Sequence, residues 1–255
     1  MAGHPFAGLA AAALAAAAAG AVTGLLQTKL EIHPILSGIL TMSSLYSVNL
    51  YVLGSRSNLS LIGSDTLFSL AQGLLPKEQA AAYKEVVRIL LPLLVCALCA
   101  LALVWFFKTH LGLCIRATGN NEDMVRASSI NVDAMKILTL AVSNACVGLA
   151  GAVLAQYQGY ADISSGIGIV VVGLASVIIG EAIVGRRSVT VGLLSAVFGS
   201  LLYRYIVAAA LRSSIFPVYA LRIVSAAIVV LALSVPVVKK RLQLRALRKK
   251  ARQDA

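Results

Sequence analysis

Charged residues are scarce in this chain, and their scarcity argues against a soluble protein. Only 13% of the 255 residues are charged, whereas 59% are hydrophobic. The mean hydropathy is +0.89, which is too high for a domain that must keep a wettable surface. The sequence therefore predicts an integral membrane protein.

The sequence also lacks the motifs of several chemistries. It contains no GxxxxGK[ST] segment, so the chain has no P-loop with which to bind ATP itself. The four cysteines and three histidines are scattered, and Cys96 and Cys99, although spaced as CxxC, lie in a purely apolar run. We therefore expect no disulfide framework, no metal site and no cofactor.

Long apolar runs dominate what is present. A bilayer core about 30 Å thick needs about 20 helical residues, because each residue adds about 1.5 Å. Seven stretches meet this requirement: 5–27, 34–53, 86–107, 137–158, 166–185, 189–211 and 218–238. Since backbone groups find no water in lipid, these stretches should be helices, and the predicted fold is an all-α polytopic membrane protein.

Positive charge is concentrated at the C-terminal end. Eight of the 22 basic residues lie between positions 239 and 252, directly after the last apolar stretch. This placement is typical of a cytoplasmic segment near anionic lipid, and without interleaved aromatic residues it does not indicate nucleic-acid binding. We therefore predict a transmembrane domain over 1–238 and a basic cytoplasmic tail over 239–255.

Counting spans back from this tail assigns a side to each loop. The turn at Lys29, the polar segment 108–136 and the link 185–188 are expected in the cytoplasm. The outward-facing segments are then 54–85, 159–165 and 212–217. The loop 54–85 mixes apolar residues with few charges, so we expect it to fold back onto the membrane surface. An outer N-terminus without a cleavable signal is unusual, and we expect that one or more helices precede this sequence.

The polar segment 108–136 contains the signals of a short helix of its own. Asn120 and Asn121 can cap a helix whose first turn is acidic, as the helix dipole favours, and Met124 belongs to its small apolar face. Asp133 is placed to cap the next span. Such a helix suits docking to another protein, although the same pattern fits an ordinary helix in an interfacial loop.

The same segment resembles a known motif. The stretch IRATGNNEDMVRASSINV, followed by YQGYAD and GLASVIIGE, resembles permease subunits of bacterial ABC importers in the ribose and branched-chain amino acid permease superfamily. In that family a segment of the form RATGxxxxMxRAxGINV contacts the ATP-binding subunit. The resemblance assigns this coupling role to Arg116, Gly119, Asn120, Met124, Arg126 and Ile130. Ser129 stands where the family has glycine, so it must adopt the backbone conformation that the glycine serves or shift the turn.

The resemblance extends over about 20–236 and implies a function. TKLEIHPILSGILTMSSLYSVNL and LYRYI are similar to a subgroup associated with uptake of tryptophan or other amino acids. A multi-pass permease subunit of the bacterial plasma membrane is implied, carrying an aromatic or branched-chain amino acid; a sugar or another small solute is the alternative. The implied partners are two ATPase subunits, an extracytoplasmic substrate-binding protein, a second permease subunit that would make a homodimer, and membrane lipid.

Polar residues within the spans are candidates for the translocation pathway, because they are costly to place in lipid. The candidates are Asn49, Asn144, Gln156 and Arg204. Each amide could equally bond a neighbouring helix, and Arg204 could instead extend to the outer interface.

Two further patterns concern helix packing and helix ends. Small residues four positions apart predict close helix contacts: Gly148 with Ala152, Gly151 with Ala155, and Gly192 with Ala196. Asp162, followed by Ser164 and Ser165, is placed to cap a helix that begins near Gly166.

The sequence argues against two other protein classes. A membrane-embedded enzyme would need a catalytic dyad or an acid-rich metal motif inside the spans, but the aspartates lie in predicted loops. A gradient-driven carrier usually shows buried acids and internal repeats, and neither is clear here. The sequence favours a permease that is driven by a separate ATPase.

Overall fold

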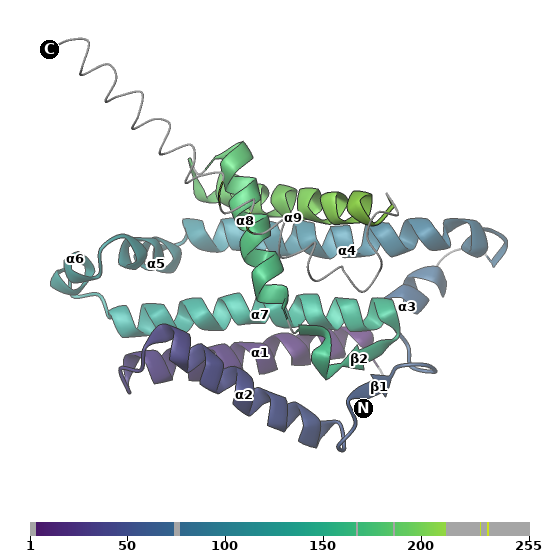
Figure 1. Cartoon of the computed structure of the whole chain (residues 1–255), viewed down its shortest axis with the longest axis horizontal. Helices are drawn as coiled ribbons and strands as arrows, with labels where there is room; N and C mark the ends of the chain where they lie inside the picture. Colours follow the sequence, from purple (N-terminus) through teal and green to yellow (C-terminus); the bar gives the residue numbers. More distant parts are fainter. Residues whose placement is uncertain are drawn as a thin grey trace, which may run out of the picture. The chain divides into compact units, whose positions relative to one another are not determined.

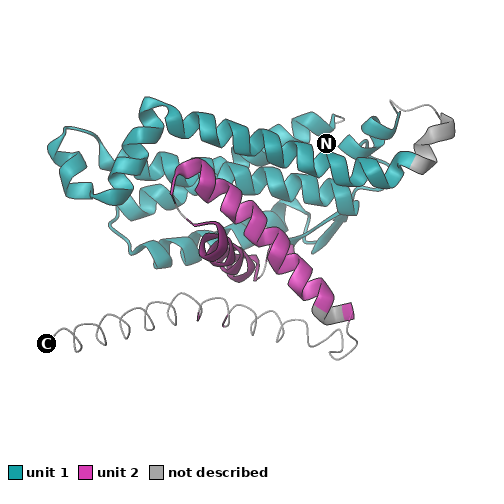
Figure 2. Cartoon of the chain, turned by 90° about the horizontal axis from the view of Figure 1, so that it is seen from above, with its two compact units in different colours: residues 1–164 teal, residues 165–255 magenta. Residues whose placement is uncertain are grey.

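The computed structural model describes residues 4–73, 77–166, 168–185 and 187–212, together with Val230 and Ser234. The chain divides into two compact units, residues 1–164 and 165–255, which Figure 2 shows in teal and magenta. Apart from Val230 and Ser234, the predicted seventh span 218–238 and the predicted tail 239–255 lie outside the described residues.

The first unit is helical with one small sheet (Figure 1). Its elements, in chain order, are α1 (Pro5–Thr28), α2 (Pro34–Val52), β1 (Asn58–Ser60), α3 (Leu67–Gly73), α4 (Lys77–Lys108), α5 (His110–Asn120), α6 (Glu122–Ala127), α7 (Val132–Gln158) and β2 (Tyr160–Asp162). A 3-10 helix, η1 (Ile163–Gly166), follows β2. The second unit contains α8 (Ile169–Val184) and α9 (Val189–Arg212).

Local sequence explains several helix ends. α1 and α2 each begin with a proline, which suits the first helical turn because its missing N–H would be unpaired there. α7 ends at Gly159, whose φ of 77° is the left-handed conformation that closes many helices.

Within the described residues, six helices are long and apolar enough to cross a membrane. They are Pro5–Thr28, Pro34–Val52, Tyr83–Lys108, Val132–Gln158, Ile163–Val184 and Val189–Ala209. The first six predicted spans are thus confirmed, with shifts at their ends. No more than 18% of any span's most apolar window is buried, as expected when lipid covers the side chains.

The segment 54–85 differs from the predicted simple loop. It contains β1, α3 and the start of α4, which begins at position 77 rather than at the predicted 86. The sequence KEQAAAYKE at 77–85 consists of good helix formers that carry no hydropathy signal, so a search for apolar runs misses it. α7 likewise begins five residues before the predicted position 137.

The most extensive helix contact in the first unit joins α1 to α7, which run antiparallel. Gly20 and Gly24 of α1 lie directly on Leu140 and Ile137 of α7. Gly148 of α7 lies in the same way on the backbone of α1 around Ala12. Glycine at these points lets the two backbones approach closely, and a side chain at any of them would overlap the other helix.

The predicted small-residue contacts are partly confirmed. Gly148 packs closely, as predicted, but nothing lies within 4 Å of a Cβ built on Gly151 or Gly192. In the second unit, α8 and α9 instead meet at Gly180, which lies against Ser195, and at Gly199, which lies against Ser176. Spacing alone identifies small residues but not the face of the helix that meets a neighbour.

At one end of the first unit, hydrogen bonds connect segments that are far apart in the sequence. β1 and β2 pair antiparallel, with Asn58 opposite Asp162 and Ser60 opposite Tyr160. Gln156 of α7 accepts a hydrogen bond from the Leu67 N–H at 2.8 Å and donates one to the Pro5 carbonyl at 3.4 Å. This end therefore joins the segments 54–85 and 159–165, which the order of spans placed on one side of the membrane.

The four cysteines are free thiols. Cys99 of α4 and Cys146 of α7 lie with their sulfur atoms 3.7 Å apart, where these two helices meet. Cys114 in α5 is buried.

Candidate functional site

The segment after α4 forms two short helices rather than the single one expected. α5 begins after Thr109, whose hydroxyl accepts a hydrogen bond from the Gly112 N–H at 3.4 Å. α6 begins after Asn121, whose side chain accepts one from the Met124 N–H at 3.1 Å. The prediction that Asn121 caps this helix is confirmed. Asn120 is instead the last residue of α5, and Asn121 is the single residue between the two helices.

The turn after α6 contains a residue with left-handed backbone, at the position where the family motif has glycine. Ser129 has a φ of 59°, in the left-handed region that side chains rarely adopt. The Ile130 N–H bonds back to the Val125 carbonyl at 3.3 Å. Of the two outcomes that the sequence left open for Ser129, the structure shows the left-handed backbone.

The cap of α7 was predicted at the wrong residue. Asn131 is the capping residue, and its side chain accepts a hydrogen bond from the Ala134 N–H at 3.0 Å. Asp133 lies inside the first turn, where its carboxylate is free to pair with other segments. Asp162 was also assigned wrongly: its carboxylate caps the short turn at Ser164, and α8 begins only at Ile169. The error at Asp133 arises because an acid near a helix start can serve either the cap or the first turn. The error at Asp162 arises because the 3-10 helix η1 separates this residue from α8.

Two ion pairs attach α6 to the start of α7. Arg126 lies 3.3 Å from Asp133, and Lys136 lies 2.7 Å from Glu122. Between them Val125 is buried, with only 1% of its surface exposed. One face of α6 is thus held on the protein, while Met124 on the other face is 57% exposed. Asp123 and Ala127 are exposed as well.

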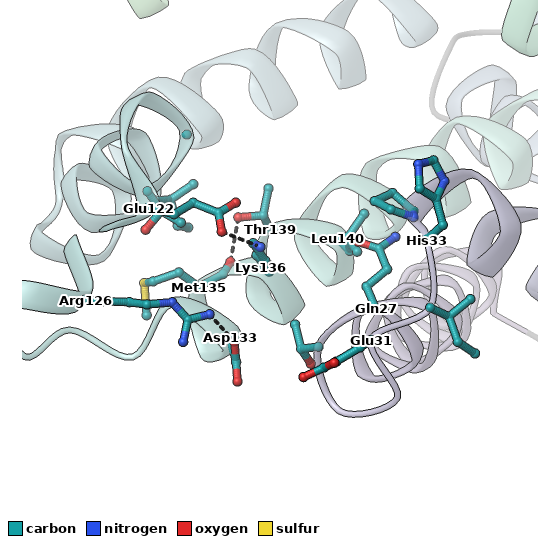
Figure 3. A pocket seen from close by; sticks show the side chains of 16 residues that line it. Gln27, Glu31, His33, Glu122, Arg126, Asp133, Met135, Lys136, Thr139 and Leu140 are labelled. Carbon is teal, nitrogen blue, oxygen red and sulfur yellow. Dashed lines mark hydrogen bonds and ion pairs between the residues drawn. The ribbon is translucent and has the colours of Figure 1, made fainter. Parts of the chain in front are cut away.

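A polar cavity of about 840 Å³ lies at this end of the first unit. Figure 3 shows Gln27, Glu31 and His33 on one side of it and Glu122 and Arg126 on the other. Asp133 and Lys136 of α7 lie between these two groups. The turn between α1 and α2 therefore shares a cavity with α6, although some ninety residues separate them in the sequence.

Asp133 joins the two sides of this cavity. Besides Arg126, its carboxylate faces Lys29 in the α1–α2 turn, with Nζ and Oδ2 4.0 Å apart. The structure thus brings the Lys29 turn and the segment 108–136 to one end of the unit, as the order of spans predicted.

The six residues assigned to coupling all lie in α5, α6 or the turn that follows. Arg116, Gly119, Asn120, Met124 and Arg126 are exposed, and Ile130 is half-buried. Of these, Gly119 and Arg126 also line the cavity. The residues that sequence reasoning missed are Glu122 and Lys136, whose pairing spans fourteen positions and has no local signal.

The four residues assigned to the pathway occupy different settings. Asn49 lies on the exposed side of α2, and Arg204 lies on the exposed side of α9 next to the buried Tyr203. Asn144 donates a hydrogen bond to the Leu140 carbonyl of its own helix at 2.9 Å. Gln156 bonds the starts of α1 and α3. Gln156 thus makes the contact with neighbouring helices that the sequence left open as its alternative, whereas Asn144 bonds its own helix.

Comparison with known proteins places these features in a family. Residues 1–233 match the family described as "Branched-chain amino acid transport system / permease component". The chain belongs to this permease family. It is a membrane component of a transport system and a multi-pass protein of the plasma membrane, and the resemblance found in its motifs is confirmed.

Two relatives resemble the chain over much of its length. It is 35% identical over 194 residues to the "Tyrosine transport system permease protein" of Clostridioides difficile (strain R20291), covering 76% of this chain and 61% of that protein. It is 32% identical over 165 residues to an uncharacterized protein of Rickettsia prowazekii (strain Madrid E), covering 64% of this chain and 54% of that protein. The chain thus spans less than two thirds of the length of these relatives. No solved structure matches it.

Proposed function

We propose that this chain is the permease subunit of an ATP-binding cassette importer and that α6 is the helix that contacts its ATPase subunit. The observation that carries this proposal is the asymmetry of α6. Its inner face is attached to α7 by two ion pairs, and its outer face presents the exposed Met124. A short helix that is attached to α7 on one face and exposed on the other can contact a partner and transmit the partner's movement to α7.

The basic residues near α6 support a cytoplasmic position for this end of the unit. The end that carries α6 also carries Lys29, Lys108, Arg116 and Lys136, and the positive-inside rule favours the cytoplasm for such an end. ATP hydrolysis then takes place on the separate subunit, since this chain has no P-loop. The opposite end, with β1, β2 and α3, would face the substrate-binding protein outside the cell.

The proposed cargo is an amino acid. The relative named for tyrosine transport supports an aromatic solute, and the family description supports a branched-chain one. A second permease subunit would complete the pathway in a homodimer. Asn49 and Arg204 remain the predicted pathway residues, because their exposed positions leave them free to face such a partner.

Co-purification of an ATPase subunit tests the proposal. The wild-type chain should capture a subunit that carries a GxxxxGK[ST] loop, and Met124→Asp and Arg126→Glu should weaken that capture. Met124→Asp places a charge on the exposed contact face, whereas Arg126→Glu also repels Asp133. Ile62→Asp, at an exposed position at the opposite end of the unit, is the matched control and should bind as the wild type does.

Two results would contradict the proposal. Equal capture by the wild type and by both α6 variants would remove the role of α6. Failure of the wild-type chain to hold any ATPase subunit, with uptake that persists without ATP, would favour a gradient-driven carrier instead. Competition of uptake by tyrosine, leucine and ribose would identify the class of solute.

A further inference from the structure

The turn between α1 and α2 has two features that the family motif does not include. Glu31 has a φ of 51°, although it is not glycine. Such strained conformations persist where the surroundings enforce them, and they cluster at functional sites. Leu30, at the polar end of the unit between Lys29 and Glu31, has 64% of its surface exposed.

The charge of Glu31 is not compensated within the part of the chain that the structure describes. Its carboxylate lines the cavity opposite α6 but has no ion pair or hydrogen bond there, whereas Glu122 and Asp133 in the same cavity are both paired. Asp123 of α6 is likewise an exposed carboxylate without a pair among the described residues. Free carboxylates therefore lie both on α6 and on the α1–α2 turn.

Exposed apolar side chains occur on the same two segments. Leu30 belongs to the turn and Met124 to α6, and each is more than half exposed. An apolar side chain with a charged neighbour matches the apolar core and polar rim of a protein interface. The two segments thus offer the same combination of one apolar side chain and one carboxylate.

Asp133 connects these two segments. Asp133 faces Arg126 of α6 and Lys29 of the turn at the same time. The lysine and arginine side chains are 66% and 58% exposed, and ion pairs so close to water contribute only about 0–1 kcal/mol to stability. The arrangement therefore does more to orient the turn than to hold the fold together.

We propose that residues 29–31 form a second contact for the ATPase subunit, beside α6. In this composite surface Leu30 and Met124 enter an apolar part of the partner, and Glu31 and Asp123 meet basic side chains on it. Asp133 is the positioning residue that holds the turn in register with α6. The inference rests on the proposed function, and it adds a contact that the motif of α5 and α6 does not contain.

The affinity of the purified ATPase subunit for the full chain in lipid nanodiscs tests this surface. Leu30→Asp and Glu31→Arg should each weaken binding about tenfold, as expected for a charge placed against an apolar or basic contact. Glu31→Gln should weaken binding less and reduce its dependence on salt, since the exposed attraction is screened by ions. Ile62→Asp and Asp65→Arg, exposed residues at the opposite end, should bind as the wild type does.

Two further variants separate contact from folding. Glu31→Gly relieves the strained backbone and also removes the charge, so it should weaken binding as much as Glu31→Gln does. A photo-crosslinking residue at position 30 should attach to the ATPase subunit, and the same residue at position 62 should not. This readout needs no disruptive charge.

The possible outcomes distinguish the inference from the function on which it rests. Wild-type affinity for Leu30→Asp and Glu31→Arg, with no crosslink from position 30 and weakened binding of Met124→Asp, would overturn the second contact and leave the proposed function intact. Unchanged binding of Met124→Asp and Arg126→Glu as well would overturn the proposed function. An effect of Glu31→Gly without an effect of Glu31→Gln would assign the turn to backbone strain and not to docking.

Discussion

The contact of α7 with α1 and its contact with α6 are built from different interactions. α1 and α7 lie backbone against backbone at Gly20, Gly24 and Gly148. α6 is joined to α7 by two exposed ion pairs, and its Val125 is buried. Close packing tolerates little displacement, whereas exposed ion pairs can be stretched at small cost. The difference suits a rigid pair of spans that carries an adjustable helix at one end.

The largest expected effect comes from breaking the rigid contact. Gly148→Leu places a side chain into the backbone of α1, where a Cβ alone would lie 2.5 Å from the Ala12 carbonyl oxygen. We expect it to destabilise the fold by about 3 kcal/mol, at the upper end for overpacking. Thermal unfolding in detergent measures this loss. Gly151→Leu, on the same helix with open space around it, is the control and should stay near the wild type.

A smaller loss is expected at the end that α7 shares with α1 and α3. Gln156→Leu removes the acceptor of the Leu67 N–H and a donor to the Pro5 carbonyl. Leaving these groups unpaired should cost about 1–3 kcal/mol. Gln158→Leu, at an exposed position two residues on, should change the unfolding temperature little. Equal stability of the two variants would mean that the bonds of Gln156 do not hold this end together.

Removing the cap of α6 should have a still smaller and local effect. Asn121→Ala deletes the acceptor of the Met124 N–H, which typically costs about 1 kcal/mol. Hydrogen exchange should become faster at Met124 and its neighbours, while the exchange of α1 and α7 stays unchanged. Asn120→Ala is the control, because Asn120 does not cap α6. Faster exchange in both variants would show that the cap was assigned to the wrong residue.

The smallest effect on stability should come from the ion pairs. Glu122→Lys or Lys136→Glu alone should change the free energy of unfolding by about 1 kcal/mol or less, because both side chains are partly exposed. If α6 passes movement to α7, transport per ATP hydrolysed should nevertheless fall in each single variant. The double variant, which restores the pair with its charges reversed, should recover transport. Failure of this recovery would show that the pair does not carry the coupling.

Much of the fold could be predicted because lipid imposes a simple rule on sequence. About 20 apolar residues in a row define a span, and the first six predicted spans match helices of the structure. Polar helices obey no such rule, which is why the start of α4 and the whole of α5 were missed. α5 begins with HLGLC and carries only a threonine cap, which many loops share.

The candidate site could be predicted only in its local part. The cap at Asn121 depends on neighbouring residues, and this prediction is confirmed. At Ser129 the sequence left two outcomes open, and the structure shows the left-handed backbone. The pairing of Asp133 with Lys29 joins positions far apart in the chain, and it depends on the antiparallel packing of α1 on α7. A sequence without aligned relatives contains no signal for such a pair, so Asp133 was assigned to a cap instead.

The side of the membrane on which α6 lies tests the central claim most directly. A single cysteine at Asp123, which is exposed, can be reacted with a membrane-impermeant maleimide after the four native cysteines are replaced by alanine. We predict no labelling in intact cells and full labelling once the membrane is permeabilised. A cysteine at Ile62 should show labelling in both. Labelling of position 123 in intact cells would place α6 outside, beyond the reach of any ATPase, and would contradict the proposed function.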